Sequence, residues 1–401
     1  MTVTPTTNNH KPKRIGIITS GGDCPGLNAV IRAVVKVATY KYGWEVYGIP
    51  YGTDGFIDLL VGKRQPEELR IKENGYDIPG LVQGLDILHF LSGSVLGSIS
   101  KGDPAKHADE ILQGYEKLGL NALIAIAGDG SLEIIEGLAR QAEAQGSPWN
   151  WIAVPKTIDN DIPYTEVSVG FDTAVNRVTQ ALYDLTFTAA SHDRVMVVQV
   201  MGRDSGYLGM EAGIAGGADA ILVPELTPIL DDSVITGICR HIGRLRDRGR
   251  QFTLIVVSEG VRNHLGQKEH YIGDYLANQI QEYSRKLCGT GQPEYCHLDR
   301  VDTRVTTLGH LQRGGTPTAT DRLLATSFGR EAVELIANGN YNQMVIWQNG
   351  RVSSVPISHV IEQIKAARRE KVAPSRVDPQ GFLVHTARDI GIYVGEVDDN
   401  D

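Results

Sequence analysis

Short apolar runs alternate with amphipathic segments along most of the chain, and this alternation restricts the possible folds more than any other feature. The runs have the length and composition of buried strands. The predicted strands are 14–19, 45–49, 122–127, 152–154, 195–200, 220–223, 253–257 and 304–308. Apolar residues recur at helical spacing in 29–37, 172–189, 231–246, 271–287 and 321–337. Strands that alternate with helices form parallel sheets covered by helices, so the pattern predicts an α/β fold.

Length and charge exclude several classes of protein. With 401 residues the chain is long enough for two domains. Its net charge of −9 argues against nucleic acid as the main partner, because phosphate backbones attract basic surfaces. No apolar run approaches the roughly 20 residues of a membrane-spanning helix, and residues 1–13 lack the hydrophobic segment of a secretory signal. The four cysteines show no zinc-binding spacing. We therefore expect a cytoplasmic protein without a membrane partner.

The segment 155–162, Pro-Lys-Thr-Ile-Asp-Asn-Asp-Ile, follows the predicted strand 152–154. Its carboxylates, Asp159 and Asp161, therefore lie at the C-terminal end of a strand, where open α/β sheets bind ligands. One carboxylate can accept a proton from a substrate hydroxyl while the other stays charged. Lys156 adds a cation suited to phosphate. Taken alone, the motif is more simply an acidic turn that caps a strand.

Two glycine-rich loops follow other predicted strands. The loop 20–23 precedes a helix, so its backbone N–H groups could hold a phosphate. In 127–131, glycines flank Asp129, whose carboxylate could bind Mg²⁺. Either loop alone could be an ordinary strand-to-helix turn. The chain contains neither a Walker A motif nor a G-x-G-x-x-G fingerprint.

Four arginines lie at or beside the ends of predicted strands: Arg194, Arg203, Arg304 and Arg313. The planar guanidinium group of arginine suits bidentate phosphate binding. One such arginine would more simply form a surface ion pair, but four beside the carboxylate and glycine motifs lead us to expect that they converge on one ligand. Phosphoryl transfer needs this combination of positioning and charge neutralisation.

Taken in order, these motifs resemble the 6-phosphofructokinase family of the G-G-D-x-P-G-x-N type. The resemblance spans about Lys13 to Gln348 and is carried by 21–28, 128–131, 155–161, 191–194, 201–203, 258–260 and 303–315. It implies two Rossmann-like three-layer α/β/α domains with mostly parallel sheets and the active site in the cleft between them. We expect a polar tail at 1–12, a donor-binding domain at 13–170 plus about 312–350, a sugar-phosphate-binding domain at 171–311, and a C-terminal helix and tail at 351–401.

The resemblance implies phosphorylation of the C1 hydroxyl of fructose 6-phosphate, which gives fructose 1,6-bisphosphate, with Mg²⁺ as cofactor. The expected catalytic residues are Asp159 as base, with Thr157, Asp161 and Arg203. The sugar phosphate would be bound by Thr157, Asp159, Arg194, Met201, Gly202, Arg203, Glu259, Arg304, His310, Leu311, Gln312 and Arg313. The donor would be bound by Gly22, Lys101, Gly128, Asp129, Gly130, Ser131 and Lys156, with Asp129 as the metal ligand.

The resemblance also implies an oligomer. Arg194 and Arg304 would reach the 6-phosphate bound by a neighbouring subunit, so a homotetramer or homodimer is expected. Five residues resemble parts of the effector pocket that lies between subunits in the family: Arg32, Lys36, Asp219, Arg248 and Arg250. Thr186 and Phe252 replace basic residues of that pocket, so we expect allosteric regulation by a different effector.

The phosphoryl donor depends on a mixed pattern. Gly130 resembles the ATP-using members of the family, whereas Lys156 resembles the pyrophosphate-using members. An aspartate at position 130 would repel the α-phosphate, and its absence leaves room for a nucleotide, so we favour ATP over pyrophosphate. ADP stays an alternative, because Ser100, Ile134 and Pro50 change positions that line the nucleotide site in the family.

Two other functions are compatible with parts of the chain. A lipid or NAD kinase could share the glycine loop, but the motifs at 157–161, 201–203 and 310–315 argue against it. A non-catalytic sugar-phosphate sensor would need none of Asp159, Asp129 and Arg203, and all three are present. An active phosphotransferase is therefore the favoured hypothesis.

Overall fold

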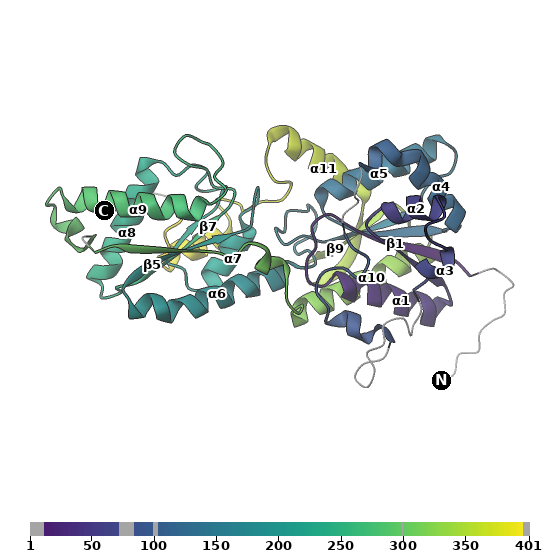
Figure 1. Ribbon diagram of the computed structural model, residues 1–401, viewed down its shortest axis with the longest axis horizontal. Helices are drawn as coiled ribbons and strands as arrows, with labels where there is room; N and C mark the ends of the chain where they lie inside the picture. The colour runs from purple at the N-terminus through teal and green to yellow at the C-terminus, as the bar shows by residue number, and fades with distance from the viewer. Residues whose placement is uncertain (1–11, 72–83, 99–102, 299, 396–401) are drawn as a thin grey trace. The chain divides into compact units, whose positions relative to one another are not determined.

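The computed structural model describes residues 12–71, 84–98, 103–298 and 300–395 (Figure 1). The chain divides into two compact units. Unit 1 comprises Met1–Pro155 and Arg322–Ile361, and unit 2 comprises Lys156–Asp321 and Glu362–Asp401. Each unit contains one sheet, of six strands in unit 1 and four in unit 2. The predicted α/β fold with mostly parallel sheets is confirmed.

The sheet of unit 1 has the strand order β10-β9-β4-β3-β1-β2. Every pairing is parallel except that of β9 with β10. The strand β3, one of the two central strands, is buried along its whole length, as expected for a parallel strand with both faces covered. The strands are β1 (Arg14–Ser20), β2 (Glu45–Ile49), β3 (Ala122–Ala127), β4 (Trp151–Pro155), β9 (Gln343–Gln348) and β10 (Arg351–Pro356).

The helices of the unit 1 segments, two of which continue across a unit boundary, connect these strands. They are α1 (Leu27–Tyr42), α2 (Asp54–Leu60), α3 (Pro66–Leu69), α4 (Ala108–Leu118), α5 (Asp129–Ala144), α10 (Ala319–Ala337) and α11 (Ile357–Glu370), with the 3₁₀ helices η1 (Gly84–His89) and η2 (Pro104–His107). Helices α1 and α5 each begin directly after a glycine that follows a strand, which places two helix N-termini at the C-terminal edge of the sheet.

The sheet of unit 2 has the order β6-β7-β5-β8, and all its pairings are parallel. Its strands are β5 (Arg194–Val200), β6 (Ala220–Leu222), β7 (Thr253–Ser258) and β8 (Asp302–Thr307). Its helices are α6 (Phe171–Ser191), α7 (Tyr207–Ala215), α8 (Asp232–Asp247), α9 (Ile272–Cys288) and α12 (Phe382–Asp389), with η3 (Pro293–Leu298) and η4 (Gly309–Arg313).

Side chains alternate between the two faces of this second sheet. Val195 and Val197 belong to a core cluster that includes residues of α8 and α9, whereas Met196 packs with Ala189 of α6. This is the two-residue period of a strand. The sheet is therefore covered by helices on both faces.

Strands β9 and β10 were absent from the sequence prediction, although a signal for them exists. They pair antiparallel around Asn349 and Gly350, which have φ angles of 52° and 72°. Asn-Gly with two positive φ angles is the preferred two-residue hairpin turn. Residues 351–356 thus form a strand, where we expected the C-terminal helix and tail to begin.

The segment 156–169 groups with unit 2, whereas the sequence placed a boundary near Gly170. The main-chain oxygens of Asp159 and Asp161 explain the grouping, because they accept hydrogen bonds from Ser205 and Ser375 of unit 2. Residues 362–401 also belong to unit 2, where Tyr393 forms a bridge to Ala220 of β6.

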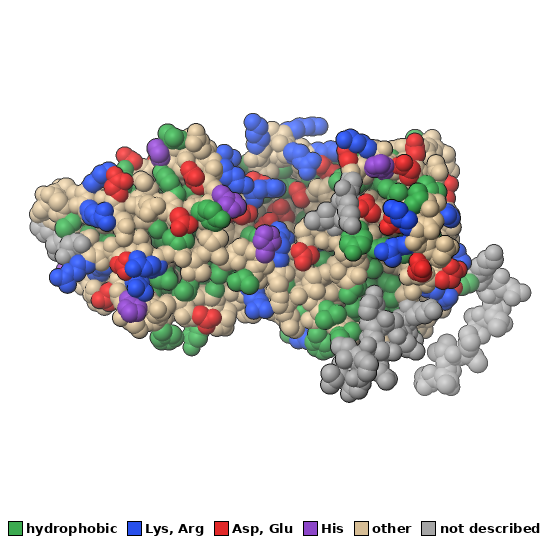
Figure 2. Space-filling view, in the orientation of Figure 1, with side chains coloured by type: hydrophobic (Ala, Val, Ile, Leu, Met, Phe, Trp, Pro, Cys, Tyr) green, Lys and Arg blue, Asp and Glu red, His purple; other side chains and the backbone are tan. Residues whose placement is uncertain are grey.

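Acidic and basic side chains are interspersed on the face shown in Figure 2. Ion pairs such as Lys63–Asp58 and Lys286–Glu282 have solvent-exposed members, so each contributes little to stability. None of the helices in the described part of the chain combines the length and the apolarity that crossing a bilayer requires.

Candidate active site

The two predicted glycine loops meet at one edge of the unit 1 sheet. Strands β1 and β3 are parallel neighbours, and Ser20 at the end of β1 pairs with Ala127 at the end of β3. The Ser20 hydroxyl donates to the Ser131 hydroxyl at 3.0 Å, which links the two loops directly. Gly22 and the segment 128–131 therefore follow adjacent strand ends.

The loop after β3 opens onto the N-terminus of a long helix. Gly128 is the N-cap of α5, and Asp129, Gly130 and Ser131 form its first turn. Backbone N–H groups at a helix N-terminus carry partial positive charge and attract phosphate. A Cβ atom added at Gly130 would meet no atom within 4 Å beyond its chain neighbours and the adjacent helix backbone, so space remains beside this glycine for a ligand.

Asp129 is the only predicted metal ligand. The described residues contain no group of three or more His, Cys, Asp or Glu side chains arranged to hold a metal ion. Mg²⁺ in phosphate-transferring sites is commonly held by one or two carboxylates together with substrate phosphates and water. A carboxylate on the first turn of α5, beside the open space at Gly130, fits that kind of site.

Two buried polar residues that sequence reasoning missed hold the segment 91–97 beside β1 and α1. The Thr19 hydroxyl donates to the Gly97 carbonyl at 2.6 Å. The Asn28 amide donates to the Gly93 carbonyl at 3.1 Å and accepts from the Val95 N–H at 2.9 Å. Asn28 closes the G-G-D-x-P-G-x-N motif, which was the available signal.

Two of the other positions expected to line the nucleotide site, Ile134 and Pro50, lie within the described residues. Ser100 and Lys101 lie outside the described residues. Ile134 is 42% exposed on α5, and Pro50 lines a cavity of about 390 Å³ with Leu96.

The loop after β4 is held by its own side chains. The side chain of Lys156 is almost fully buried, and its backbone forms an isolated β-bridge with Val169. The Thr157 N–H donates to the Val169 carbonyl at 3.2 Å, and the Thr157 hydroxyl accepts from the Asp159 N–H at 3.0 Å. Thr157 therefore supports the turn that presents Asp159.

Asn160 stabilises the same loop from inside, a role that sequence reasoning missed. Its φ angle is 52°, in the left-handed region that asparagine tolerates better than most residues. Its amide donates to the Glu166 carbonyl at 2.9 Å, and its side-chain oxygen accepts from the Ser168 N–H at 3.0 Å. The asparagine between the two aspartates thus fixes the backbone of both.

The loop after β5 contacts the Asp159 loop. The Ser205 hydroxyl donates to the Asp159 carbonyl at 3.1 Å. Gly202 has a φ angle of 117°, and a Cβ atom there would lie 2.6 Å from the Ser205 carbonyl, so only glycine fits this turn. Arg203 is exposed and pairs with Asp204 at 2.7 Å.

The predicted residues that follow β7 and β8 lie near the end of β5 and the loop after it. The Glu259 N–H donates to the Val200 carbonyl at 2.9 Å, at the end of β5. The buried Gln312 side chain accepts from the Met201 N–H at 3.1 Å. Its neighbours His310, Leu311 and Arg313 follow β8 on η4. A cavity of about 600 Å³ lies between this segment and α6.

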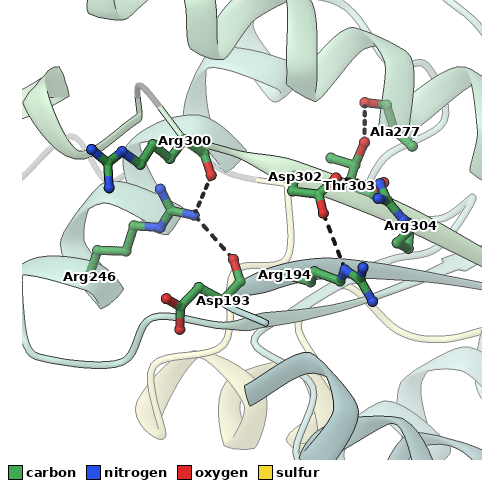
Figure 3. A network of polar contacts seen from close by, with 8 residues as sticks. All are labelled: Asp193, Arg194, Arg246, Ala277, Arg300, Asp302, Thr303 and Arg304. Carbon is green, nitrogen blue, oxygen red and sulfur yellow. Dashed lines mark hydrogen bonds and ion pairs between the residues drawn. The ribbon is translucent and has the colours of Figure 1, made fainter. Parts of the chain in front are cut away.

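Arg194 and Arg304 do not join this group within one chain, which is compatible with the expectation that they reach the phosphate bound by a neighbouring subunit. Arg194 is the first residue of the seven-residue strand β5, whereas Met201 and Arg203 follow its last residue. At about 3.3 Å per residue the two ends are roughly 20 Å apart. Arg304 pairs with Met196 near the beginning of β5 and therefore lies toward the same far edge (Figure 3).

Two carboxylates, one fully buried and one half-buried, fix the backbone around the unit 2 loops. Asp321 is fully buried and accepts from the N–H groups of Gly170 and Thr173, at the start of α6. Glu225 accepts from the N–H groups of Gly206, at 2.8 Å, and Val377, at 3.0 Å. Burial raises the pKa of both carboxyl groups above their usual range, and these hydrogen bonds partly oppose the rise.

The residues expected in an effector pocket contact acids within their own units. Arg32 and Lys36 both contact Asp86, at 2.6 and 2.7 Å. Their hydrogen bonds, that of Lys36 first, hold the pKa of Asp86 below its usual range. In unit 2, Arg250 pairs with Asp219 at 2.9 Å.

The other expected effector residues lie in unit 2. Arg248 lines a cavity of about 190 Å³ together with residues of α8, Arg388 of α12 and the segment 391–394. The Thr186 hydroxyl donates to the Leu182 carbonyl, and Arg250 stacks on the Phe252 ring.

Solved structures with similar folds include phosphofructokinases. The Pichia pastoris phosphofructokinase in the T-state matches with a TM-score of 0.77 and 25% identity, over 96% of this chain and 39% of that chain. A pyrophosphate-dependent phosphofructokinase from Marinobacter aquaeolei matches with a TM-score of 0.68 and 21% identity, over 87% and 83% of the two chains. The second likeness indicates the fold alone.

Sequence comparisons agree with this fold. Residues 14–336 match the family described as Phosphofructokinase. The chain is 49% identical to the ATP-dependent 6-phosphofructokinase 2 of Nostoc sp., over 96% of this chain and 99% of that protein. It is 47% identical to the ATP-dependent 6-phosphofructokinase of Thermosynechococcus vestitus, over 96% and 93%. Together with the ordered motifs and the two α/β units, these matches establish that the chain belongs to the phosphofructokinase family.

Proposed function

We propose that the protein is an ATP-dependent 6-phosphofructokinase, a glycolytic kinase that transfers the terminal phosphoryl group of ATP to the C1 hydroxyl of fructose 6-phosphate. The observation that carries this proposal is the identity of 46–49% with ATP-dependent 6-phosphofructokinases over 96% of the chain. Those relatives share one donor, which supports ATP over pyrophosphate and ADP. Gly130 is compatible with ATP, because the space beside it is open.

In this reaction Asp159 is the base that accepts the proton of the C1 hydroxyl. A positioned carboxylate of this kind contributes roughly a hundred- to ten-thousandfold in rate. Thr157 and Ser205 fix its backbone on two sides, which supports a precise orientation. Asp161 stays charged and orients the assembly of metal and phosphate.

The donor phosphates are bound by backbone N–H groups of Gly22 and of 128–131 and by Lys156, Lys101 and the N-terminus of α5. We propose Asp129 as the ligand of a Mg²⁺ ion that arrives with the donor. When bound, this ion neutralises part of the phosphate charge. The buried Lys156 supplies a second positive charge at the end of β4.

The sugar phosphate is bound by the residues that follow the strands of unit 2: Met201, Gly202, Arg203, Glu259, His310, Leu311, Gln312 and Arg313. Arg194 and Arg304 lie at the other edge of that sheet, so we propose that they serve a second copy of the chain. This requires a homo-oligomer, a dimer or tetramer. A cytoplasmic location also stays a prediction.

The test is fructose 1,6-bisphosphate formation from fructose 6-phosphate with ATP, pyrophosphate or ADP in parallel, each with Mg²⁺. We expect turnover with ATP, and turnover with pyrophosphate alone would contradict the proposed donor. The Asp159→Asn variant should lose about a thousandfold in kcat and keep its KM for fructose 6-phosphate. Asp247→Asn, which changes a half-exposed aspartate of unit 2, is the control. Near-native turnover of Asp159→Asn would refute the assignment of the base.

A further inference from the structure

A single carboxylate bridges the two arginines at the far edge of the unit 2 sheet (Figure 3). Strands β5 and β8 are parallel neighbours, and Arg194 pairs in register with Asp302. One oxygen of Asp302 contacts Arg194 Nε at 3.2 Å, and the other accepts from Arg304 Nη1. Each guanidinium group therefore has its own oxygen of the same carboxylate.

The backbone beneath this bridge is fixed by other contacts. Buried Arg246 donates to the main-chain oxygens of Asp193 at 3.5 Å and of Arg300 at 3.4 Å, just before β5 and β8 begin. The Thr303 hydroxyl donates to a carbonyl of α9 at 3.3 Å. These bonds hold the starts of both strands, so the remaining freedom lies in the long side chains of the two arginines.

Charge explains what Asp302 does for those side chains. Two guanidinium groups on adjacent strands repel each other, and a carboxylate between them offsets the repulsion. The three groups together keep one positive charge. Because Asp302 is 39% exposed, solvent screens the bridge and its stabilising effect is small. Stability alone therefore explains the arrangement poorly, whereas positioning explains it well.

The bridge also leaves donors for a ligand. A guanidinium group has five N–H donors. The contacts described above use one N–H of Arg194, and Arg304 uses Nη1 for Asp302 and for its neighbouring carbonyl. The side chains of Arg194 and Arg304 are 28% and 49% exposed, so the remaining N–H groups can reach a ligand that approaches from solvent. Phosphate oxygens match this forked geometry.

We propose that Asp302 is a positioning residue that holds Arg194 and Arg304 as a ready-formed pair for the phosphate group of a sugar phosphate bound to a second copy of the chain. The inference rests on the proposed function. It goes beyond that function, because it assigns the geometry of the phosphate contact to a residue that touches neither substrate. Because Asp302 already restricts the two arginine side chains, they lose less conformational entropy when phosphate binds. Asp302 should therefore increase the affinity for the sugar phosphate.

The test is steady-state kinetics of the full-length Asp302→Asn variant with fructose 6-phosphate and ATP. Asparagine keeps the size of the side chain but offers only one acceptor oxygen and no charge. We expect KM for fructose 6-phosphate to rise about tenfold, with kcat and KM for ATP changed less than about twofold. Asp302→Glu, which keeps the charge, should recover part of the loss. Asp247→Asn should leave all three constants unchanged.

A double-mutant cycle separates positioning from a general change in charge or folding. If Asp302 acts through the two arginines, then Asp302→Asn should have little further effect on KM in a background that carries both Arg194→Ala and Arg304→Ala. Additive effects would overturn the proposal. So would an unchanged KM in Asp302→Asn while the wild type is active. An inactive wild type would instead contradict the proposed function, so the two failures are distinguishable.

Protein integrity can be checked independently of activity. Asp302 is on the edge strand β8 and is partly exposed, so we expect Asp302→Asn to keep the melting temperature and the oligomer size of the wild type. If Asp302→Asn is destabilised, Asp302→Ser provides a second uncharged variant, and it must show the same rise in KM. A normal KM in a folded Asp302→Ser protein would refute the proposal.

Discussion

The hydroxyl of Ser205 donates a hydrogen bond to the main-chain oxygen of Asp159 at 3.1 Å. This bond joins the loop after β5 to the loop that carries the proposed base. It acts on the main chain of Asp159 and does not involve the carboxylate. Two loops that are distant in sequence are thereby held in one arrangement.

Ser205→Ala should reduce catalysis by loosening Asp159. A neutral hydrogen bond contributes about 1 kcal/mol, so we expect kcat/KM for fructose 6-phosphate to fall about fivefold. KM for ATP should change little. Ser191→Ala is a matched control, because that hydroxyl also donates to a carbonyl of unit 2 but lies on the exposed end of α6. Equal losses in both variants would contradict a specific role of Ser205.

Two substitutions of Asn160 can distinguish the effect of its left-handed backbone from the effect of its side-chain hydrogen bonds. Asn160→Gly removes the side-chain hydrogen bonds but tolerates the φ angle of 52°, whereas Asn160→Ala removes the bonds and strains the backbone. We expect both variants to be less stable than the wild type, and Ala to be less stable than Gly by about 1 kcal/mol. Urea unfolding measures the difference. The reverse order would show that the left-handed backbone of Asn160 is unimportant.

Gly130→Asp should change the donor without disturbing the fold. Because a Cβ at this position would meet no atom within 4 Å beyond its chain neighbours and the adjacent backbone of α5, the side chain fits. Its negative charge would face the donor phosphates and cost about 3 kcal/mol, so kcat/KM for ATP should fall roughly a hundredfold. Relative use of pyrophosphate should rise. Gly137→Asp is the matched control, since it lies on the same helix with equal space. Unchanged ATP use in Gly130→Asp would refute this view of the donor site.

The free energy of unfolding should depend on pH because of Glu211. Burial, with a smaller effect of nearby Asp172, raises the pKa of Glu211 to about 7 from 4.5. The folded state therefore binds the proton of the Glu211 carboxyl more tightly than the unfolded state does. This proton binding stabilises the folded state fully below pH 4.5, and the stabilisation is lost as the pH rises to 7.

Glu211→Gln should remove that loss, because glutamine resembles the protonated acid. We expect the variant to melt at a higher temperature than the wild type at pH 8, with a difference that shrinks toward pH 5. Glu282→Gln, a half-exposed residue of α9, should show no such trend. A higher melting temperature of the wild type than of Glu211→Gln at pH 8 would mean that the surroundings stabilise the charged Glu211 carboxylate.

Eight strands, five of the helices and the glycine-rich loops after the strands could be predicted from the amino-acid sequence, whereas β9 and β10 were missed. Apolar runs such as 122–127 can only be buried strands when helical segments flank them, and glycines at their ends allow the chain to turn. Because parallel strands place their C-terminal ends at one edge, the loops after β1 and β3 could be predicted to meet. Motif order then identified the family before any distance was known.

Tertiary structure alone decided which polar groups meet. The contacts of Ser205 with Asp159, Gln312 with Met201 and Asp321 with Gly170 join residues far apart in the chain, and no local pattern encodes them. Chain direction decided the position of Arg194, because a residue that begins a strand lies at the opposite edge from one that follows its end. Local sequence reports periodicity and turns, whereas the strand order of the sheet determines proximity.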